Sequence, residues 1–329
     1  MWVIGMVPNE LPFLVFAYLA AATLVAALQH DLGNAVGVTG LSLAVLSTLA
    51  LIVIVWRAAR TRRVVAAAVR DTLGIEVPRS RLAMMHILLA PFVVTRRDVI
   101  RTADIAYGEG ASRSLDVYLP RRNGPTGPVL VHFHGGGYRG GAKNREARPL
   151  LYRLASEGWL CVSASYALQP APFSESLADA RLAVAWARTR VRELGLERAQ
   201  VFVAGSSAGG HLALSVALTD PTIATAVSLY GYYGRAEDGQ PLTSPLGLAG
   251  PDAPPLLVAH GDNDSYVPVE AARELVMRVR AVSAQPVVYV ELAGAQHAFD
   301  LFRSIRFERL IDGIEVFATW VVDHRTADA

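Results

Sequence analysis

The chain has a single cysteine, a single lysine and few charged side chains among its 329 residues. Cys161 lies in the apolar run W-L-C-V-S, which excludes an intrachain disulfide and indicates a small buried hydrophobic residue. Lys143 is accompanied by 30 arginines, which we interpret as the codon bias of a GC-rich bacterial genome. Charged residues make up 18% and hydrophobic residues 52%, an apolar excess which indicates that part of the chain is not dissolved in water.

Motifs for metals, cofactors and nucleic acids are also missing. There is no H-E-x-x-H sequence and no pair of cysteines, so we expect no metal and no cofactor. The glycines at 135–137 are not followed by the G-K-S/T ending of a phosphate-binding loop, nor by a dinucleotide-binding acid about 20 residues later. The basic residues gather beside apolar runs, so nucleic acid is not an expected partner.

Two long stretches near the N-terminus carry no charged side chain, residues 11–28 and residues 35–56. At about 1.5 Å per helical residue, both are long enough to cross a hydrocarbon core of about 30 Å. The polar linker Q-H-D-L-G-N between them is short, so the pattern predicts a transmembrane helical hairpin. Residues 1–10 contain no lysine or arginine, which argues against a cleavable signal peptide.

A basic segment follows the second apolar run. Nine arginines lie from Arg57 to Arg97 against Asp71 and Glu76, a local charge of +7. Residues 57–73 predict a basic helix that is attracted to anionic lipid headgroups, with a solvated arginine face as the alternative. The positive charge after the second run predicts a multi-pass protein of the bacterial inner membrane, with its N-terminus and its catalytic domain in the cytoplasm.

Residues 82–94 form a 13-residue apolar run that is too short to span a bilayer. It is typical of an interfacial helix or of a flap over a catalytic domain, and the sequence does not separate these two possibilities. His86 in this run is interpreted as a packed or interfacial histidine. The expected organisation is therefore a transmembrane hairpin at 1–60, a basic juxtamembrane and lid-like segment at 61–100, and a catalytic domain at 101–329.

From about Asp98 onward, short strand and helix signals alternate, which predicts a mostly parallel sheet covered by helices on both faces. Strands are expected at 102–108, 114–119, 128–133, 159–165, 201–204, 254–260 and 286–291, and helices at 174–194 and 208–218. The first two strands are expected to form an antiparallel hairpin at the sheet edge.

Ser207 is the candidate nucleophile. It is the central residue of the sequence G-S-S-A-G, in which Gly205 and Gly209 complete a G-x-S-x-G motif directly after an apolar strand. Such a motif holds a serine in a sharp strand-to-helix turn, and glycines flank it because the neighbouring backbones approach closely. An ordinary strand-to-helix connection is the alternative.

A second motif, H-G-G-G at 134–137, follows another apolar strand. Glycines in such a loop let backbone N–H groups approach a substrate oxyanion. Tyr138, the next residue, is expected either to line an acyl pocket or to pack.

The combination of H-G-G-G at 134–137, S-Y-A-L-Q-P at 165–170 and G-S-S-A-G-G at 205–210 resembles the α/β-hydrolase fold. Within that fold, the chain is similar to hormone-sensitive-lipase-like carboxylesterases and to related microbial feruloyl and acetyl esterases, over about residues 102–324. The resemblance implies an oxyanion hole formed by the backbone N–H groups of Gly136, Gly137 and Ala208. One departure is S-Y-A-L where many relatives carry D-Y-R-L.

In this fold the catalytic residues follow the chain order serine, acid, histidine. His297 and His324 are the histidines far enough beyond Ser207, and His297 is favoured because it lies in a loop after a strand. Two acids follow the preceding strand, Asp262 and Asp264. Related hydrolases with H-G-x-x-D-x-x-V-P use the later aspartate, which implies Asp264, with Asp262 as the alternative.

These features predict a membrane-anchored serine carboxylic ester hydrolase that forms an acyl-enzyme. The expected partners are a small-molecule ester, of short or medium acyl length or an amphiphilic lipid, and the bilayer. The insertion at 230–254 is too short for a large cap over the site. An acyltransferase or peptidase with the same triad is an alternative function, as is a non-catalytic receptor with a hydrolase fold.

Overall fold

The computed structural model describes residues 2–110, 112–196, 198–236 and 243–327. Within this part of the chain, eight strands form one sheet in the order β1-β2-β4-β3-β5-β6-β7-β8. The strands are β1 (Val99–Ala106), β2 (Ser114–Pro120), β3 (Val129–Phe133), β4 (Leu160–Ala164), β5 (Val201–Ser206), β6 (Ile223–Leu229), β7 (Leu256–Gly261) and β8 (Val287–Leu292). Strand β2 pairs antiparallel with β1 and β4, and the remaining pairs are parallel, which confirms the expected mostly parallel sheet.

The central strands are short apolar runs because helices cover them on both sides. Every residue of β3, β4, β5, β6 and β7 is buried, as is usual for parallel strands. In the register, Phe133 at the end of β3 pairs with Gly205 near the end of β5. The H-G-G-G loop and the turn that carries Ser207 therefore leave the same edge of the sheet, side by side.

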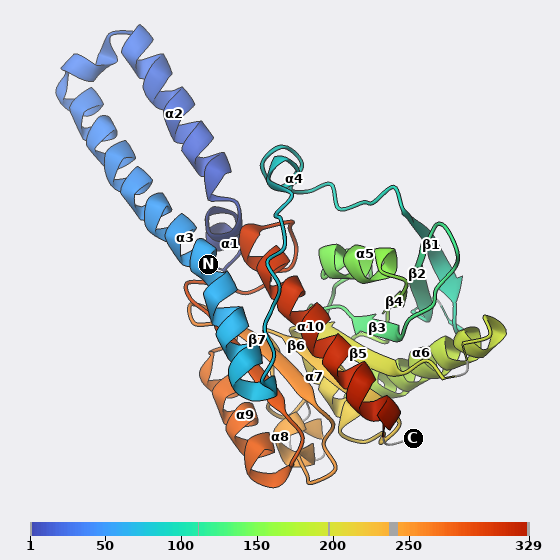
Figure 1. Cartoon of the computed structure of the whole chain (residues 1–329). Coiled ribbons are helices and arrows are strands. Elements are labelled where there is room, and N and C mark those ends of the chain that lie inside the picture. The colour runs from blue at the N-terminus through green and yellow to red at the C-terminus, as the bar shows by residue number, and fades with distance from the viewer. Residues whose placement is uncertain (1, 111, 197, 237–242, 328–329) are drawn as a thin grey trace.

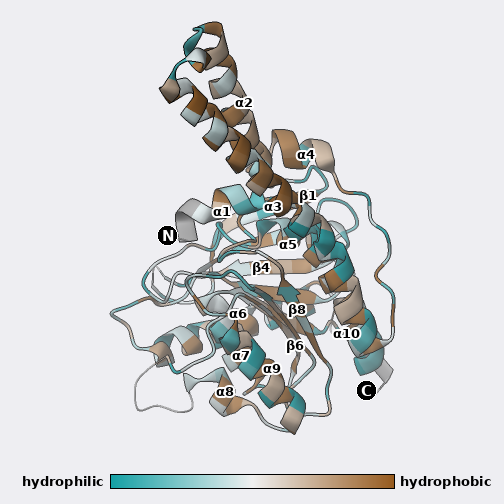
Figure 2. Cartoon of the chain, turned by 90° about the vertical axis from the view of Figure 1, so that its left-hand side faces the viewer, coloured by the Kyte–Doolittle hydropathy of each residue, from teal (hydrophilic) through white to brown (hydrophobic). Residues whose placement is uncertain are grey.

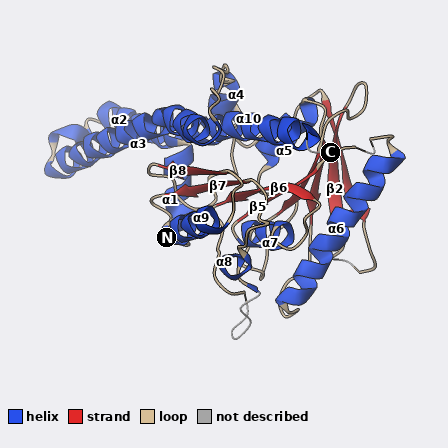
Figure 3. Cartoon of the chain, turned by 60° about the horizontal axis from the view of Figure 1, so that its bottom comes forward, coloured by secondary structure: helices blue, strands red, loops and turns tan. Residues whose placement is uncertain are grey.

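Two layers of helices enclose the sheet (Figure 3). One layer contains α5 (Arg148–Ser156), α10 (Ile305–Ala327) and the second half of α3 (Ala35–Leu73). The other contains α6 (Phe173–Glu193), α7 (Ala208–Ala217), α8 (Pro245–Leu248) and α9 (Glu270–Val282). Each layer closes its own hydrophobic core against the sheet, so the buried strands have apolar neighbours on both faces.

Two apolar helices, α2 (Pro12–Leu28) and the first half of α3, project from the part of the chain that contains the sheet as an antiparallel pair (Figure 1). Helix α3 is long and apolar enough to cross a membrane, whereas α2 is shorter, with 17 residues. The side chain of Asn34 accepts a hydrogen bond from the amide of Gly37 at the start of α3, and Gly74 ends the helix with a positive φ of 73°. These caps explain why the helix begins and ends at these residues.

The second half of α3 packs against the sheet and α10. Thr61, Val65 and Val69 are spaced by four residues and are buried where α3 packs against α10 and β8. Gly313 of α10 permits this contact, because a Cβ atom there would lie 2.3 Å from a methyl group of Val65. The expected boundary at residue 60 thus falls inside one continuous helix.

Residues 1–10 had no predicted element, and the structure places a helix there, α1 (Trp2–Glu10). Its Met6 side chain is buried in the core that also contains α10, and the following Leu11 is fully buried. The carboxylate of Glu10 forms a buried ion pair with Arg306 of α10 and accepts a hydrogen bond of 2.7 Å from the Ser304 hydroxyl. The first helix is therefore anchored to the C-terminal part of the chain.

The apolar run at 82–94 forms one short helix, α4 (Met84–Leu89), within an otherwise extended segment. Ile87 is buried, whereas Met85 and Leu89 are 66% and 75% exposed. The segment is attached to the domain through Phe92, whose ring contacts that of Phe302 edge-on.

Candidate active site

Ser207 occupies a strained turn between β5 and α7. Its φ and ψ are 55° and −118°, a conformation that non-glycine residues rarely adopt. A Cβ atom on Gly205 would lie 1.9 Å from the carbonyl oxygen of Gly209, and one on Gly209 would lie 2.0 Å from that of Phe133. Both flanking positions therefore require glycine, as the G-x-S-x-G interpretation predicts.

The structure brings Ser207, His297 and Asp264 together from three loops at the carboxyl edge of the sheet. His297 Nε2 lies 2.9 Å from Ser207 Oγ, and His297 Nδ1 lies 2.7 Å from Asp264 Oδ2. All three side chains are buried. The loops follow β5, β7 and β8, which explains how residues up to 90 positions apart meet. The arrangement can transfer a proton from the serine hydroxyl to the imidazole.

The second candidate acid, Asp262, has a different position. Its Oδ1 accepts a hydrogen bond of 2.5 Å from the amide of Gly294, whereas Asp264 contacts the imidazole of His297. Burial alone would raise the pKa of Asp264, but hydrogen bonds from His260, His297 and the amide of Val267 outweigh it and hold the pKa well below its ordinary value. Asp264 is therefore ionised and able to stabilise a charged imidazole.

The glycine-rich loop lies directly against the nucleophile. A Cβ atom on Gly135 would be 3.0 Å from Cβ of Ser207, and Gly136 and Gly137 have φ values of 127° and 62°. The hydroxyl of Tyr138 donates a hydrogen bond of 3.0 Å to the carbonyl oxygen of Ala208, the first residue of α7. Tyr138 thus connects this loop to the helix N-terminus, where backbone N–H groups and the helix dipole favour negative charge.

Two buried carboxylates behind the nucleophile had no predicted role. Glu146 accepts a hydrogen bond of 2.8 Å from the amide of Gly135 and thereby holds the glycine loop. Asp300 accepts hydrogen bonds from the hydroxyl of Ser206, at 2.6 Å, and from that of Tyr230. In the sequence, Asp300 stands out only because it lies three residues after His297. The sequence around it does not indicate that its side chain is buried.

The pKa of Asp300 reflects competing influences. Full burial raises it, the negative charge of Glu146 raises it further, and the hydrogen bonds from Ser206 and Tyr230 lower it. The result is a pKa of about 7, compared with 3.8 for an ordinary aspartate. The carboxyl group is therefore much harder to ionise than an exposed aspartate.

We predict that Asp300 makes stability depend on pH near neutrality. Because its pKa is raised in the folded state, its contribution is complete below about pH 4 and is lost as the pH rises through 7. From pH 8 to pH 6, the free energy of unfolding should increase by about 1 kcal/mol from this group. Unfolding of the detergent-solubilised chain at both pH values measures this change, and Asp300→Asn should remove it. An identical pH dependence in the variant would contradict the prediction.

His324, the alternative to His297, and two further residues, Cys161 and Asp179, lie outside the triad. His324 is near the end of α10, with its ring stacked on that of Trp320. Cys161 is buried in β4, and Asp179 of α6 is buried and accepts a hydrogen bond of 2.7 Å from Arg113. Among the residues that the structure describes, no group of three or more His, Cys, Asp or Glu side chains is arranged to hold a metal ion.

Comparisons with known sequences place the chain among ester hydrolases. The family described as BD-FAE matches residues 115–240. The chain is 36% identical over 264 residues to LipM of Mycobacterium tuberculosis, described as a probable carboxylic ester hydrolase, covering 67% of this chain and 61% of that protein. It is 33% identical over 273 residues to esterase LipC of the same organism, covering 70% and 67%. Human hormone-sensitive lipase is 34% identical over 146 residues, covering 44% of this chain and 13% of the lipase.

Solved structures share the fold at lower sequence identity. Esterase 2 of Thermogutta terrifontis has a TM-score of 0.59 at 20% identity, with 68% of this chain and 94% of that chain covered. A truncated carbohydrate esterase from gut microbiota also has a TM-score of 0.59, at 17% identity, with 67% and 96% covered. The chain spans 61% and 67% of the lengths of LipM and LipC, respectively.

Proposed function

Because the chain belongs to the α/β-hydrolase family of carboxylic ester hydrolases, we propose that it is a membrane-anchored serine esterase that works through an acyl-enzyme. The observation that carries the proposal is the chain of hydrogen bonds that links Asp264, His297 and Ser207. The Asp264 Oδ2–His297 Nδ1 distance is 2.7 Å, and the His297 Nε2–Ser207 Oγ distance is 2.9 Å. Such an arrangement increases the nucleophilicity of a serine hydroxyl by placing a base beside it.

In the proposed reaction, Ser207 Oγ attacks the ester carbonyl carbon while His297 Nε2 takes the hydroxyl proton. The tetrahedral intermediate then expels the alcohol, which receives that proton from His297 and leaves an acyl group on Ser207. Water attacks the acyl group by the same steps, so a carboxylic acid leaves and the serine is restored. Asp264 fixes the imidazole with its proton on Nδ1 and stabilises the positive charge that forms on the ring.

We assign the oxyanion hole to the backbone N–H groups of Gly136, Gly137 and Ala208. The close approach of Gly135 to Ser207 and the position of Ala208 as the first residue of α7 support this assignment. Donors of this kind stabilise the charge that develops in the transition state, and the loss of one costs about 3 kcal/mol.

Labelling by a fluorophosphonate tests the proposed nucleophile. The reagent should modify the peptide that contains Ser207, and Ser207→Ala should abolish the modification. The neighbouring Ser206 supplies a matched control, because its hydroxyl bonds to Asp300, so Ser206→Ala should still be labelled. Labelling that persists in Ser207→Ala would overturn the assignment.

We further propose that α2 and the first half of α3 anchor the enzyme in the bacterial inner membrane as a two-helix hairpin. Apolar side chains on both helices are highly exposed, including Leu28 at 71% and Leu46 at 62%, and large exposed apolar surfaces are rare on proteins surrounded by water. The four arginines within 57–63 favour the cytoplasmic side for the catalytic domain. A reporter fused to the C-terminus that was active on the outer face alone would contradict this orientation.

Short or medium acyl esters and amphiphilic lipid esters are the proposed substrates. The hairpin would hold the domain at a bilayer surface, where amphiphilic esters concentrate. The insertion at 230–254 was expected to be too short for a large cap over the site. The structure describes this insertion except for residues 237–242, and the described part contains one short helix, α8. Hydrolysis rates for a series of acyl chain lengths, measured with the full chain in nanodiscs, would define the preferred ester.

A further inference from the structure

The short helix α4 lies between two cavities of opposite chemistry. On one side, a cavity of about 540 Å³ separates α4 from the base of the α2–α3 pair. Its lining is almost entirely apolar and includes Phe13, Phe16, Leu51, Trp56, Ile87 and Leu88. Figure 2 shows that α4 lies near the adjoining parts of α2 and α3 and that these ribbons are coloured mostly as hydrophobic. Three of the lining side chains, Phe16, Ile52 and Trp56, are more than half exposed. The cavity therefore opens onto the surface that the proposed anchor presents to lipid.

On the other side of α4 lies a cavity of about 740 Å³ that is rich in arginine, which we call the arginine recess. It is lined by Arg81, Arg96, Arg97, Arg153, Arg303 and His86, together with two acids, Asp98 and Glu308. His86 belongs to α4, on the side of the helix away from Ile87 and Leu88. The same six-residue helix thus contributes to an apolar cavity and to a cationic one.

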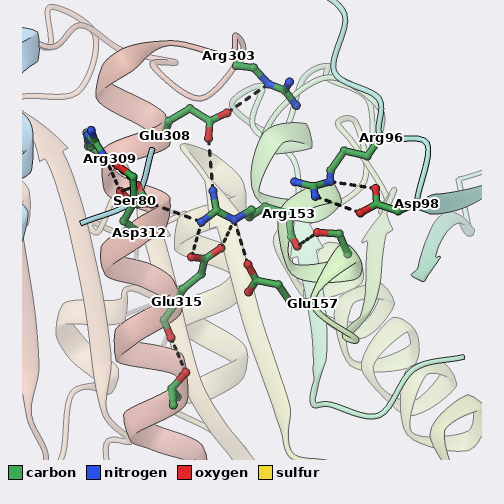
Figure 4. A network of polar contacts seen from close by, with 12 residues as sticks. Ser80, Arg96, Asp98, Arg153, Glu157, Arg303, Glu308, Arg309, Asp312 and Glu315 are labelled. Atoms are coloured by element: carbon green, nitrogen blue, oxygen red, sulfur yellow. Dashed lines mark hydrogen bonds and ion pairs between the residues drawn. The ribbon is translucent and has the colours of Figure 1, made fainter. Parts of the chain in front are cut away.

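Most of the arginines inside the recess already have carboxylate partners (Figure 4). Arg96 forms two hydrogen bonds of 3.1 Å to Asp98, and Arg303 lies 3.2 Å from Glu308. Arg153 is surrounded by four carboxylates, those of Glu157, Glu308, Asp312 and Glu315. These three arginines therefore already have acidic partners within the protein.

Arg81 and Arg97 differ from these three. Both are exposed, and among the described residues neither has a carboxylate within ion-pair distance. They lie on either side of α4 in the chain, at the ends of the apolar segment. Two exposed guanidinium groups beside an apolar helix favour an anionic ligand that also has an apolar part.

The outward surface of the α4 segment agrees with this chemistry. Met85, Leu89, Phe92 and Val93 are between 57% and 75% exposed. Exposed apolar side chains beside cationic groups are typical of a segment that lies in the interface of an anionic membrane. None of the residues lining either cavity belongs to the proposed triad, so this surface is separate from the reacting groups.

We propose that one anionic phospholipid binds around α4, with its phosphate at Arg81 and Arg97 and an acyl chain in the apolar cavity. The inference rests on the proposed membrane anchoring but not on the esterase reaction. The lipid would be a bound partner that holds the α4 segment against the base of the α2–α3 pair. Charge complementarity selects the headgroup, and continuity of the cavity with the anchor surface supplies the acyl chain.

The test uses the full chain in nanodiscs that contain a phosphatidylglycerol with a photoreactive acyl chain. Labelling should appear on peptides of α4 and of the facing parts of α2 and α3. An arginine near an anionic surface contributes about fivefold to binding, so Arg81→Gln with Arg97→Gln should weaken labelling about 30-fold. The exposed Arg122 and Arg278 provide the matched control pair, for which the same substitutions should have no effect.

A second pair of variants tests the apolar cavity. Leu88→Gln should reduce labelling, whereas Leu182→Gln, at a site of nearly equal exposure on α6, should not. Equal labelling by a photoreactive phosphatidylcholine, or unchanged labelling in the double arginine variant, would overturn the proposal. If inorganic phosphate binds to the chain but the photoreactive lipid does not label α4, the arginines form a site for free phosphate. That result would also overturn the proposal of a bound phospholipid. Hydrolysis of a water-soluble acetyl ester by the same samples reports on the proposed esterase independently.

Discussion

Replacing Asp264 by asparagine is expected to lower kcat for ester hydrolysis about 10⁴-fold, by analogy with the same substitution in serine proteases. The asparagine amide can donate a hydrogen bond to His297 Nδ1, and this would favour the tautomer in which Nε2 carries the hydrogen. His297 could then no longer accept the proton of Ser207, although the geometry of the site would be preserved. Steady-state hydrolysis of a soluble acetyl ester measures the effect.

Asp262→Asn is the matched control, because the two acids are two residues apart in the same loop. The asparagine oxygen can still accept the hydrogen bond from the Gly294 amide, so kcat should change by less than about threefold. A large loss of kcat in Asp262→Asn with little loss in Asp264→Asn would reverse the assignment of the acid.

Replacing Arg306 by methionine is expected to destabilise the folded protein by about 3 to 5 kcal/mol. The side chains of Arg306 and Glu10 are each 1% exposed, so the substitution would leave the carboxylate of Glu10 buried without its charged partner. The loss should appear as a large decrease in the unfolding temperature of the detergent-solubilised chain. It should also release α1, which proteolysis near residue 10 would detect.

A double-mutant cycle separates the free energy of the Glu10–Arg306 ion pair from the free energy lost when the packing of the Arg306 side chain changes. Glu10→Gln combined with Arg306→Met should cost less than Arg306→Met alone, because the buried charge is then absent. The exposed pair Arg190 and Glu193 gives a control for ion pairs in general, and its disruption should cost less than about 0.5 kcal/mol. A small effect at Arg306, similar to that at Arg190, would mean that α1 is not anchored by this pair.

The sequence predicted the parts of the site that depend on local spacing. Gly205, Ser207 and Gly209 lie in one tight turn, so their close approach follows from the motif alone. His297 and Asp264 could be proposed because chain order and resemblance to relatives restrict the choice. The buried network of Asp300, Tyr230 and Glu146 was not predictable in this way, because it depends on contacts between residues up to 154 positions apart in the chain.

The fold was predictable where strands are apolar and bounded by turn signals, as in β3, β5 and β7. Strand β6 and helices α5 and α9 had no predicted counterpart. At the N-terminus, the hydropathy pattern indicated a change in character after Trp56, whereas the structure continues the same helix to Leu73. The positions of Thr61, Val65 and Val69 favour one buried helical face, but the partner of that face, α10, lies more than 200 residues later in the chain.

This continuity has a mechanical consequence. Helix α3 has 39 residues, or about 59 Å of helix axis, and no proline interrupts it. If the first half of α3 spans the bilayer, the helix forms a rigid connection between the bilayer and the hydrolase domain, because its C-terminal half is packed in the core of that domain. A change in the tilt of the hairpin, as occurs when bilayer thickness changes, would then turn the whole domain and alter the height of Ser207 above the lipid surface.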